Sequence, residues 1–134
     1  MNYVSVVAGV AISEGKVLVA RRASNKSLAG FWEFPGGKVK SGESDHAALI
    51  REFREEFGIE IEPGELICES SSMPDQIILF SYLISMKELP TTSNSHDEIR
   101  WVSQSELLKL KVCPADIEVV NTVAPLIKAK NNNL

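Results

Sequence analysis

The N-terminal part of the chain has the hydrophobic pattern of paired β-strands. Residues 4–12 and 16–21 are rich in valine and flank Glu14-Gly15, a pair that favours a tight turn. This arrangement predicts a hairpin of two strands. The next segment, residues 28–39, is punctuated by glycine and carries three aromatic residues, which predicts a loop that contains a short strand.

The pattern changes to helical spacing at residues 44–57. Ile50, Phe53 and Phe57 recur three and four residues apart, so they lie on one side of a helix and should face the core. Gly58 follows directly, at the position where a left-handed glycine commonly ends a helix. The pattern therefore predicts an amphipathic helix over residues 44–57.

Strand-like segments return after a turn predicted at residues 62–65, which read Glu-Pro-Gly-Glu. Residues 66–71 and 76–86 are expected to form two strands joined through Pro74-Asp75, and residues 99–102 are expected to form a shorter one. Together with the N-terminal hairpin, these segments supply the strands of one sheet.

Two helices are predicted near the C-terminal end. Residues 103–106, Ser-Gln-Ser-Glu, have the form of a capping box and open a helix over residues 107–110. A last helix is expected to begin at Pro114 or Ala115, and Pro125 should kink it or end it. Strands on either side of an interior helix, with helices at the end, predict an α/β (α+β) fold with a mixed sheet between helices.

Length and composition are those of one compact domain. The 134 residues are 44% hydrophobic and 24% charged, which is enough apolar material for one core but leaves no room for a second domain. We therefore treat residues 1–134 as a single domain. A frayed tail is expected at residues 130–134, which include three consecutive asparagines.

Charge and cysteine usage narrow the possible partners and the location. The formal net charge is −4 and the isoelectric point is near 5.2, so no basic excess favours binding to a nucleic acid polymer. A small phosphorylated ligand still fits, because a bound cation can supply positive charge. No basic leader or membrane-spanning apolar run is visible, and Cys68 and Cys113 read as reduced thiols. The expectation is a cytoplasmic monomer or homodimer.

Three carboxylates gather on the predicted interior helix. Glu52, Glu55 and Glu56 are related as i, i+3 and i+4, so they converge on a side of the helix away from the apolar one. Their repulsion costs about 0.2–0.5 kcal/mol per close pair. A divalent cation would relieve it, because Mg²⁺ and Mn²⁺ prefer oxygen ligands. Gly36-Gly37, just upstream, would let the backbone approach such a ligand.

Each of these features also has an ordinary explanation: three glutamates can form a solvated face, and a Gly-Gly pair can be a turn. The spacing of the whole segment decides between them. It consists of a glycine, five residues, Glu43, seven residues, and then Arg-Glu-Phe-Arg-Glu-Glu-Phe-Gly-Ile at residues 51–59. This resembles the Nudix box, GX5EX7REUXEEXGU with U apolar, over residues 37–59, and every fixed position matches. WEFPGGKV before the box and EIRWVS after it resemble flanking segments of MutT-type members.

The resemblance implies a Nudix-type α/β/α sandwich and hydrolysis of a diphosphate linkage in a nucleotide-like substrate, with Mg²⁺ or Mn²⁺ as cofactor. Arg51 would orient glutamates by ion pairing, and Glu43 would hold the loop or bond to a metal ligand. We therefore expect the catalytic residues to be Glu52, Glu55 and Glu56 together with Arg51 and Glu43. The implied metal ligands are the carbonyl oxygen of Gly36 and the carboxylates of Glu52, Glu55 and Glu56.

The candidates for substrate binding are Arg22, Phe34, Gly37 and Asp116. Arg22 falls where MutT-type enzymes place an arginine on the phosphates, and Arg21 should point to the opposite face of the strand. The alternative for Arg22 is an exposed cation at a strand end. Phe34 matches a base-contacting aromatic residue, although core packing explains it equally well.

The chain departs from the family pattern at Ser95. Many relatives carry a glutamate at this position, six residues before the tryptophan of EIRWVS, and a hydroxyl cannot replace a carboxylate. Asp97 or Glu98 could move in, or the helix glutamates suffice, so the general base is left open. His96 in the same loop, and His46 in the box, are expected to be exposed to solvent.

Asp116 bears on the choice of base, because MutT-type members place a base-reading side chain here. An ionised aspartate only accepts hydrogen bonds, which favours bases with N–H donors over the carbonyl edge of thymine or uracil. Relatives with a Pro-Ala-Asp-Ile segment include enzymes that act on cytidine nucleotides, and 8-oxoguanine also offers N–H donors. The alternative is an acid that caps the last helix.

The expected activity is therefore hydrolysis of a nucleoside triphosphate, 8-oxo-dGTP or a (d)CTP-like substrate, to nucleoside monophosphate and pyrophosphate. This would be a MutT-type cleansing of the nucleotide pool. One alternative is a hydrolase of another diphosphate-linked small molecule. A catalytically silent Nudix domain that only binds a ligand is the other, and the intact box glutamates disfavour it.

Overall fold

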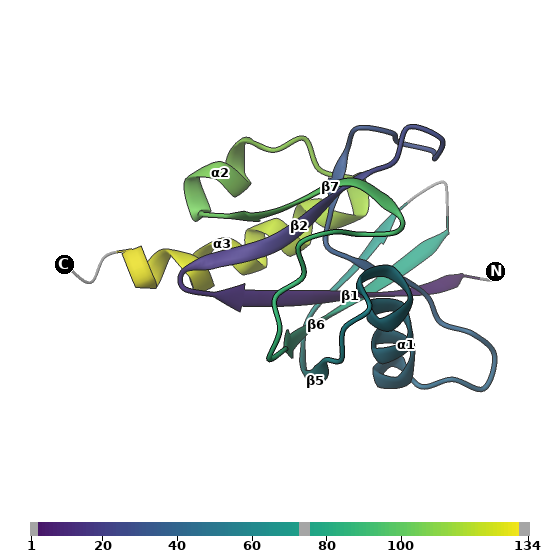
Figure 1. Cartoon of the computed structure of the whole chain (residues 1–134). Helices are drawn as coiled ribbons and strands as arrows, with labels where there is room; N and C mark the ends of the chain where they lie inside the picture. Colours follow the sequence, from purple (N-terminus) through teal and green to yellow (C-terminus); the bar gives the residue numbers. More distant parts are fainter. Residues whose placement is uncertain (1–2, 73–75, 132–134) are drawn as a thin grey trace.

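The computed structural model describes residues 3–72 and 76–131, with side chains as far as residue 127. Its elements form an α/β/α sandwich, in which a mixed sheet lies between α1 on one face and α2 and α3 on the other (Figure 1). In chain order the elements are β1 (Val4–Ser13), β2 (Lys16–Arg22), β3 (Trp32–Glu33), β4 (Gly36–Lys38), α1 (Asp45–Phe57), β5 (Glu62–Ser72), β6 (Ile77–Ser85), β7 (His96–Val102), α2 (Gln104–Lys109), a 3₁₀ turn η1 (Pro114–Asp116) and α3 (Ile117–Asn131).

The N-terminal hairpin is paired only next to its turn. Ile12 lies opposite Val17 and Ser13 opposite Lys16, after which β1 and β2 separate. Strand β1 then pairs with β4 and, in parallel, with β6, whereas β2 pairs with β3 and β7. The sheet is thus divided into two halves that are joined near the turn and diverge from it.

Two hydrophobic clusters cover the two faces of the sheet. Along β1 the side chains alternate, so that Val7 and Ala11 face α1 while Ala8 and Val10 face α3. The cluster under α1 includes Leu18, Ala48, Leu49, Phe53, Ile59, Ile61 and Ile84. The cluster under α2 and α3 includes Val17, Val19, Trp32, Phe34, Leu79, Val102, Leu107, Val119, Val120, Val123 and Ile127.

Local signals in the sequence predicted the turn and the helix ends correctly. Glu14 and Gly15 both have positive φ, 51° and 76°, as a tight hairpin turn requires. Ser44 caps α1 by accepting from the Ala47 N–H at 3.1 Å, and Gly58 ends the helix with φ 68°. The capping box at the start of α2 is also confirmed.

The turn predicted at residues 62–65 is wrong. Strand β5 already begins at Glu62, and Pro63 lies opposite Ile84 of β6. The register shifts between Pro63 and Leu66, which indicates a bulge. Proline is tolerated here because β5 is the outermost strand of its half of the sheet. The predicted connection through Pro74-Asp75 lies outside the described residues.

Pro125 does not end the last helix, which continues to Asn131. The carbonyl of Asn121 loses its intrahelical partner to the proline, but both residues are exposed, so water can bond to that carbonyl. The helix thus includes residues 130 and 131 of the expected frayed tail, and residues 132–134 lie outside the described part. Among the described residues, no helix has the length and apolar character needed to cross a membrane.

Gly9 on β1 is required by the packing of α1 against the sheet. A Cβ at this position would lie 2.7 Å from Phe53 Cε1 and 2.8 Å from Ile84 Cδ1. We expect Gly9→Ala to lower the free energy of unfolding by about 1–3 kcal/mol through overpacking. Urea denaturation of Gly9→Ala, alone and combined with Phe53→Leu, measures this, and the cost of the alanine should be smaller when the phenylalanine ring has been replaced. Equal costs with and without the ring would contradict the proposed clash.

Candidate functional site

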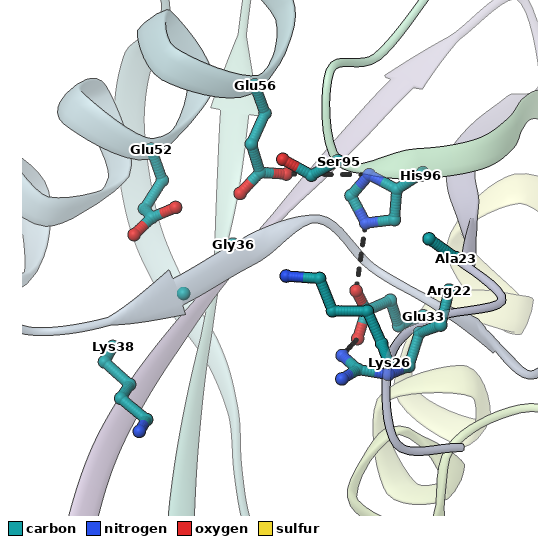
Figure 2. A pocket seen from close by; sticks show the side chains of 11 residues that line it. Arg22, Ala23, Lys26, Glu33, Gly36, Lys38, Glu52, Glu56, Ser95 and His96 are labelled. Atoms are coloured by element: carbon teal, nitrogen blue, oxygen red, sulfur yellow. Dashed lines mark hydrogen bonds and ion pairs between the residues drawn. The ribbon is translucent and has the colours of Figure 1, made fainter. Parts of the chain in front are cut away.

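A cleft of about 320 Å³ lies at the end of β2 that is far from the turn, where the two halves of the sheet are already apart. Five parts of the fold contribute to it: the end of β2 with the following loop, β3, β4, α1 and the start of β7 (Figure 2). The lining residues are Arg22, Ala23, Lys26, Glu33, Gly36, Gly37, Lys38, Glu52, Glu56, Ser95 and His96. Of the residues singled out in the sequence, the cleft therefore brings together Arg22, Gly36, Gly37, Glu52, Glu56, Ser95 and His96.

Helix α1 brings two of its three clustered carboxylates into the cleft. Glu52 and Glu56 line it, one turn apart on the same helix face (Figure 2). Glu55 lies outside, with its side chain 57% exposed and a single 3.3 Å ion pair to Arg51. The structure thus separates two glutamates that line the cleft from a third that is exposed to solvent.

Arg51 holds this carboxylate patch in place. Its guanidinium donates to both carboxylate oxygens of Glu43, at 2.7 and 2.9 Å, and to Glu52 Oε2 at 2.9 Å. A further bond to the Lys38 carbonyl at 3.0 Å ties the loop before the helix to the same group. Hydrogen bonds from Arg51 and from the Lys40 N–H lower the pKa of Glu43 to about 2. Glu43 and Arg51 accordingly fasten the loop to α1, the arrangement that the resemblance implied.

The two glycines of β4 leave no space for a side chain. A Cβ on Gly36 would lie 1.8 Å from the carbonyl oxygen of Val7, which belongs to the paired strand β1. A Cβ on Gly37 would lie 2.4 Å from the Glu52 carboxyl group. The backbone of β4 therefore lies close to strand β1 at Gly36 and close to Glu52, a candidate metal ligand, at Gly37.

Glu56 is a buried carboxyl group whose environment disfavours its charge. Only 7% of the residue is exposed, and among the described residues its Oε1 has no hydrogen bond, although His96 Nδ1 lies 3.7 Å from it. Burial, followed by the neighbouring Glu52 and Glu33, raises its pKa well above the ordinary value. The unsatisfied oxygen of Glu56 and the neighbouring Glu52 carboxylate together supply hard oxygen ligands, which fit a divalent cation.

Glu33 and His96 form a contact that the sequence did not reveal. Glu33 accepts from Arg22 Nη1 at 3.1 Å through one oxygen, and its other oxygen lies 3.0 Å from His96 Nε2 (Figure 2). The expectation of a solvated His96 is wrong, since its side chain is only 5% exposed and its ring stacks on Phe57. The only signal for Glu33 was its place in the WEFPGGKV segment, between two buried aromatic residues.

The two arginines at the end of β2 point to opposite faces, as strand geometry predicted. Arg22 lines the cleft, whereas Arg21 pairs with Glu98 at 3.4 Å and lies over the Trp32 ring. Glu98 also binds Arg100 at 2.8 Å.

The loop before β7 puts no carboxylate of its own into the cleft. Ser95 lines the cleft, but Asp97 is exposed and Glu98 is held on the other face of the sheet by its two arginines. Neither acid takes the position of the missing glutamate in this structure. His46 is exposed, as expected.

Asp116 is not among the residues that line the cleft, and it is only 5% exposed. Its Oδ1 accepts from the Phe34 N–H at 3.2 Å, and its carboxyl lies within 4.8 Å of the Glu33 carboxylate and the Cys113 sulfur. Burial, with a smaller contribution from the Glu33 charge, raises the pKa of Asp116 to about 8. The expectation was an ionised Asp116, whereas this burial favours the neutral form, which can donate as well as accept.

Phe34 and Cys113 are buried, whereas Cys68 is partly exposed. The Phe34 ring is 3% exposed and belongs to the cluster under α3, so core packing accounts for it, while its N–H bonds to Asp116. Cys68 and Cys113 are both free thiols. Burial raises the pKa of Cys113 to about 12, so it is not a reactive thiolate.

Similar proteins share both the sequence and this architecture. The NUDIX domain family matches residues 3–123. The CTP pyrophosphohydrolase of Escherichia coli is 34% identical over 132 residues, which cover 97% of this chain and 98% of that protein. A putative 8-oxo-dGTP diphosphatase of Mycobacterium tuberculosis is 36% identical, over 83% of this chain and 81% of its own.

A solved structure extends the likeness to the fold. The solution structure of the Nudix hydrolase MutT from methicillin-resistant Staphylococcus aureus has a TM-score of 0.74 and 39% identity, and it covers 93% of this chain and 98% of its own. Members of this family act on small nucleotide substrates and generally depend on divalent metals. The family match, the relatives and the geometry of the cleft agree: this chain belongs to the Nudix hydrolase family.

Proposed function

We propose that this protein hydrolyses a nucleoside triphosphate to a nucleoside monophosphate and pyrophosphate, with Mg²⁺ or Mn²⁺ as cofactor. One observation carries the proposal: two carboxyl groups of α1, one with an unsatisfied buried oxygen, face Gly36 across a cleft that also contains three cationic side chains. Carboxylates suit the metal, and the cations suit the phosphates of the substrate.

The residues present divide into a metal side and a phosphate side. Glu52, Glu56 and the carbonyl oxygen of Gly36 would hold the cation, and Glu55, which lies outside the cleft on the same side of α1, would join these ligands when the cation is bound. When bound, the cation polarises the phosphates and promotes ionisation of the attacking water. Arg51 keeps Glu52 in position, and Arg22 offers its guanidinium to the phosphate chain.

Asp116 and Glu33 are proposed to read the base at the inner end of the cleft. A neutral carboxyl group presents one donor and one acceptor, which matches the ring nitrogen and exocyclic amine of cytosine. An ionised carboxylate matches the two adjacent N–H groups of a guanine ring. The names of the two curated relatives, a CTP pyrophosphohydrolase and a putative 8-oxo-dGTP diphosphatase, support substrates of these two kinds. A neutral Asp116 no longer argues against thymine or uracil.

The metal mechanism is tested by charge removal on α1. We expect Glu56→Gln or Glu55→Gln to lower kcat by several orders of magnitude, and added chelator to abolish wild-type turnover. Glu60→Gln is a matched control, because Glu60 is exposed and pairs with Arg54. Steady-state kinetics on a nucleoside triphosphate panel measure both effects. Full turnover in excess chelator, or by the Glu56→Gln variant, would exclude the mechanism.

Glu56→Gln, which is expected to lower activity, should raise the stability of the metal-free protein. The folded-state pKa of Glu56 is raised above the pKa in the unfolded chain. The contribution of this carboxyl group to stability is therefore complete below the unfolded pKa and is lost as pH rises through the folded pKa. Without metal, Glu56→Gln should therefore have a higher Tm than the wild type, with a gap that widens between pH 5 and pH 8.

The role of Asp116 is tested by the pH dependence of base choice. As pH rises through about 8, Asp116 loses its proton, so turnover of (d)CTP relative to 8-oxo-dGTP should fall. Asp116→Asn keeps a donor and an acceptor at every pH, and should make the ratio independent of pH. Asp116→Ala should lose at least about tenfold on the preferred substrate. If Asp116→Ala only lowered thermal stability and left the substrate ranking unchanged, base choice would lie elsewhere.

The acids that follow Ser95 should not be needed. Asp97 is exposed, and Glu98 is neutralised by arginines on the other side of the sheet. Asp97→Asn and Glu98→Gln should therefore each leave kcat within about tenfold, or 1.4 kcal/mol, of the wild type. A much larger loss in either variant would show that this acid moves into the cleft during turnover and replaces the glutamate of the relatives.

A further inference from the structure

The three cations that line the cleft differ in how they are engaged. Arg22 is occupied by Glu33 at 3.1 Å and by the Ser27 carbonyl at 2.7 Å. Lys38 is directed away from the carboxylates in Figure 2, and its carbonyl accepts from Arg51. The Lys26 ammonium points into the cleft between Glu56 and Glu33 (Figure 2). Among the described residues no ion-pair or hydrogen-bond partner of this ammonium is found.

The neighbouring acids cannot easily become its permanent partners. Both oxygens of Glu33 are already engaged, one by Arg22 and one by His96. Glu56 feels the positive charge of Lys26, but the two groups form no ion pair within 4.0 Å. Lys26 is therefore a cation placed among acids without being neutralised by any one of them.

The loop that carries Lys26 is held in place by hydrogen bonds at its ends and in its middle. The Arg22 N–H donates to the Phe31 carbonyl at 2.9 Å, and the Gly30 N–H donates to the Arg22 carbonyl at 3.1 Å. The Arg22 side chain then fastens the loop through Ser27, next to Lys26. The Lys26 N–H itself closes a turn on the Ala23 carbonyl at 3.0 Å. These bonds fix the backbone from which the exposed Lys26 side chain extends.

We propose that Lys26 is a binding residue for the phosphate chain of the substrate. The assignment rests on the proposed function and adds a specific contact to it. An ammonium in a cleft is stabilised by an anion that brings hydrogen-bond acceptors, and a diphosphate group supplies several. Once a cation compensates Glu52 and Glu56, phosphate oxygens are the acceptors left for Lys26. Arg22 has to exchange a bond to Glu33 or Ser27 for phosphate, whereas Lys26 has no bond to give up.

Binding of inorganic pyrophosphate in the presence of Mg²⁺ tests this directly, by isothermal titration calorimetry on the full chain. We expect Lys26→Gln to raise the Kd for pyrophosphate about tenfold, the loss of one hydrogen bond to a charged group. Lys26→Arg keeps the charge and should stay within about threefold of the wild type. Lys16→Gln is the matched control, since Lys16 is exposed at the opposite end of β2, and it should leave the Kd unchanged.

Two results would overturn the assignment. One is a Kd for pyrophosphate in Lys26→Gln equal to that of the wild type and Lys16→Gln. The other is a loss of Mn²⁺ affinity of about tenfold in Lys26→Gln without pyrophosphate, which would show that the lysine acts on the metal ligands. Failure of the proposed function is seen separately: the wild type would then hydrolyse no nucleoside triphosphate, whatever the effect of Lys26 on pyrophosphate binding.

Discussion

The separation of β1 from β2 is the constraint on which the rest of the site depends. Because the two strands pair only beside their turn, β1 is free to take β4 and β6 as partners while β2 takes β3 and β7. The cleft lies between the two resulting halves, with α1 packed beside it. The glycines of β4 allow the closest approach, to β1 at Gly36 and to Glu52 at Gly37. If β1 and β2 were paired along their whole length, the two halves of the sheet would not separate and these groups would not line one cleft.

Features set by local sequence could be predicted, because their causes lie within a few residues. Ser44 and Gly58 bound α1, and the box spacing places Glu52 and Glu56 on one face. The same local reasoning failed at Pro63-Gly64, where a turn-like sequence lies in an edge strand and the decisive fact is the pairing with β6.

Contacts between distant segments could not be predicted from the sequence. Glu33 and His96 are 63 positions apart, and only the pairing of β2 with both β3 and β7 brings them together. The pKa of Asp116 is raised by burial, and no sequence motif encodes burial. The sequence therefore predicted where the box residues lie on α1, whereas their partners and the effects of burial had to come from the structure.

Under the proposed function, the unsatisfied oxygen of Glu56 would link the conformational stability of the protein to its surroundings. Carboxyl groups that are crowded without a cation and compensated with one would make the cation a folding ligand, and the gain in stability would follow RT ln(1 + [L]/Kd). The population of folded molecules would then follow the free concentration of the cation in the same compartment. Depletion of the ion would remove activity and also shorten the lifetime of the polypeptide, because the emptied molecules unfold more often and are exposed to proteases.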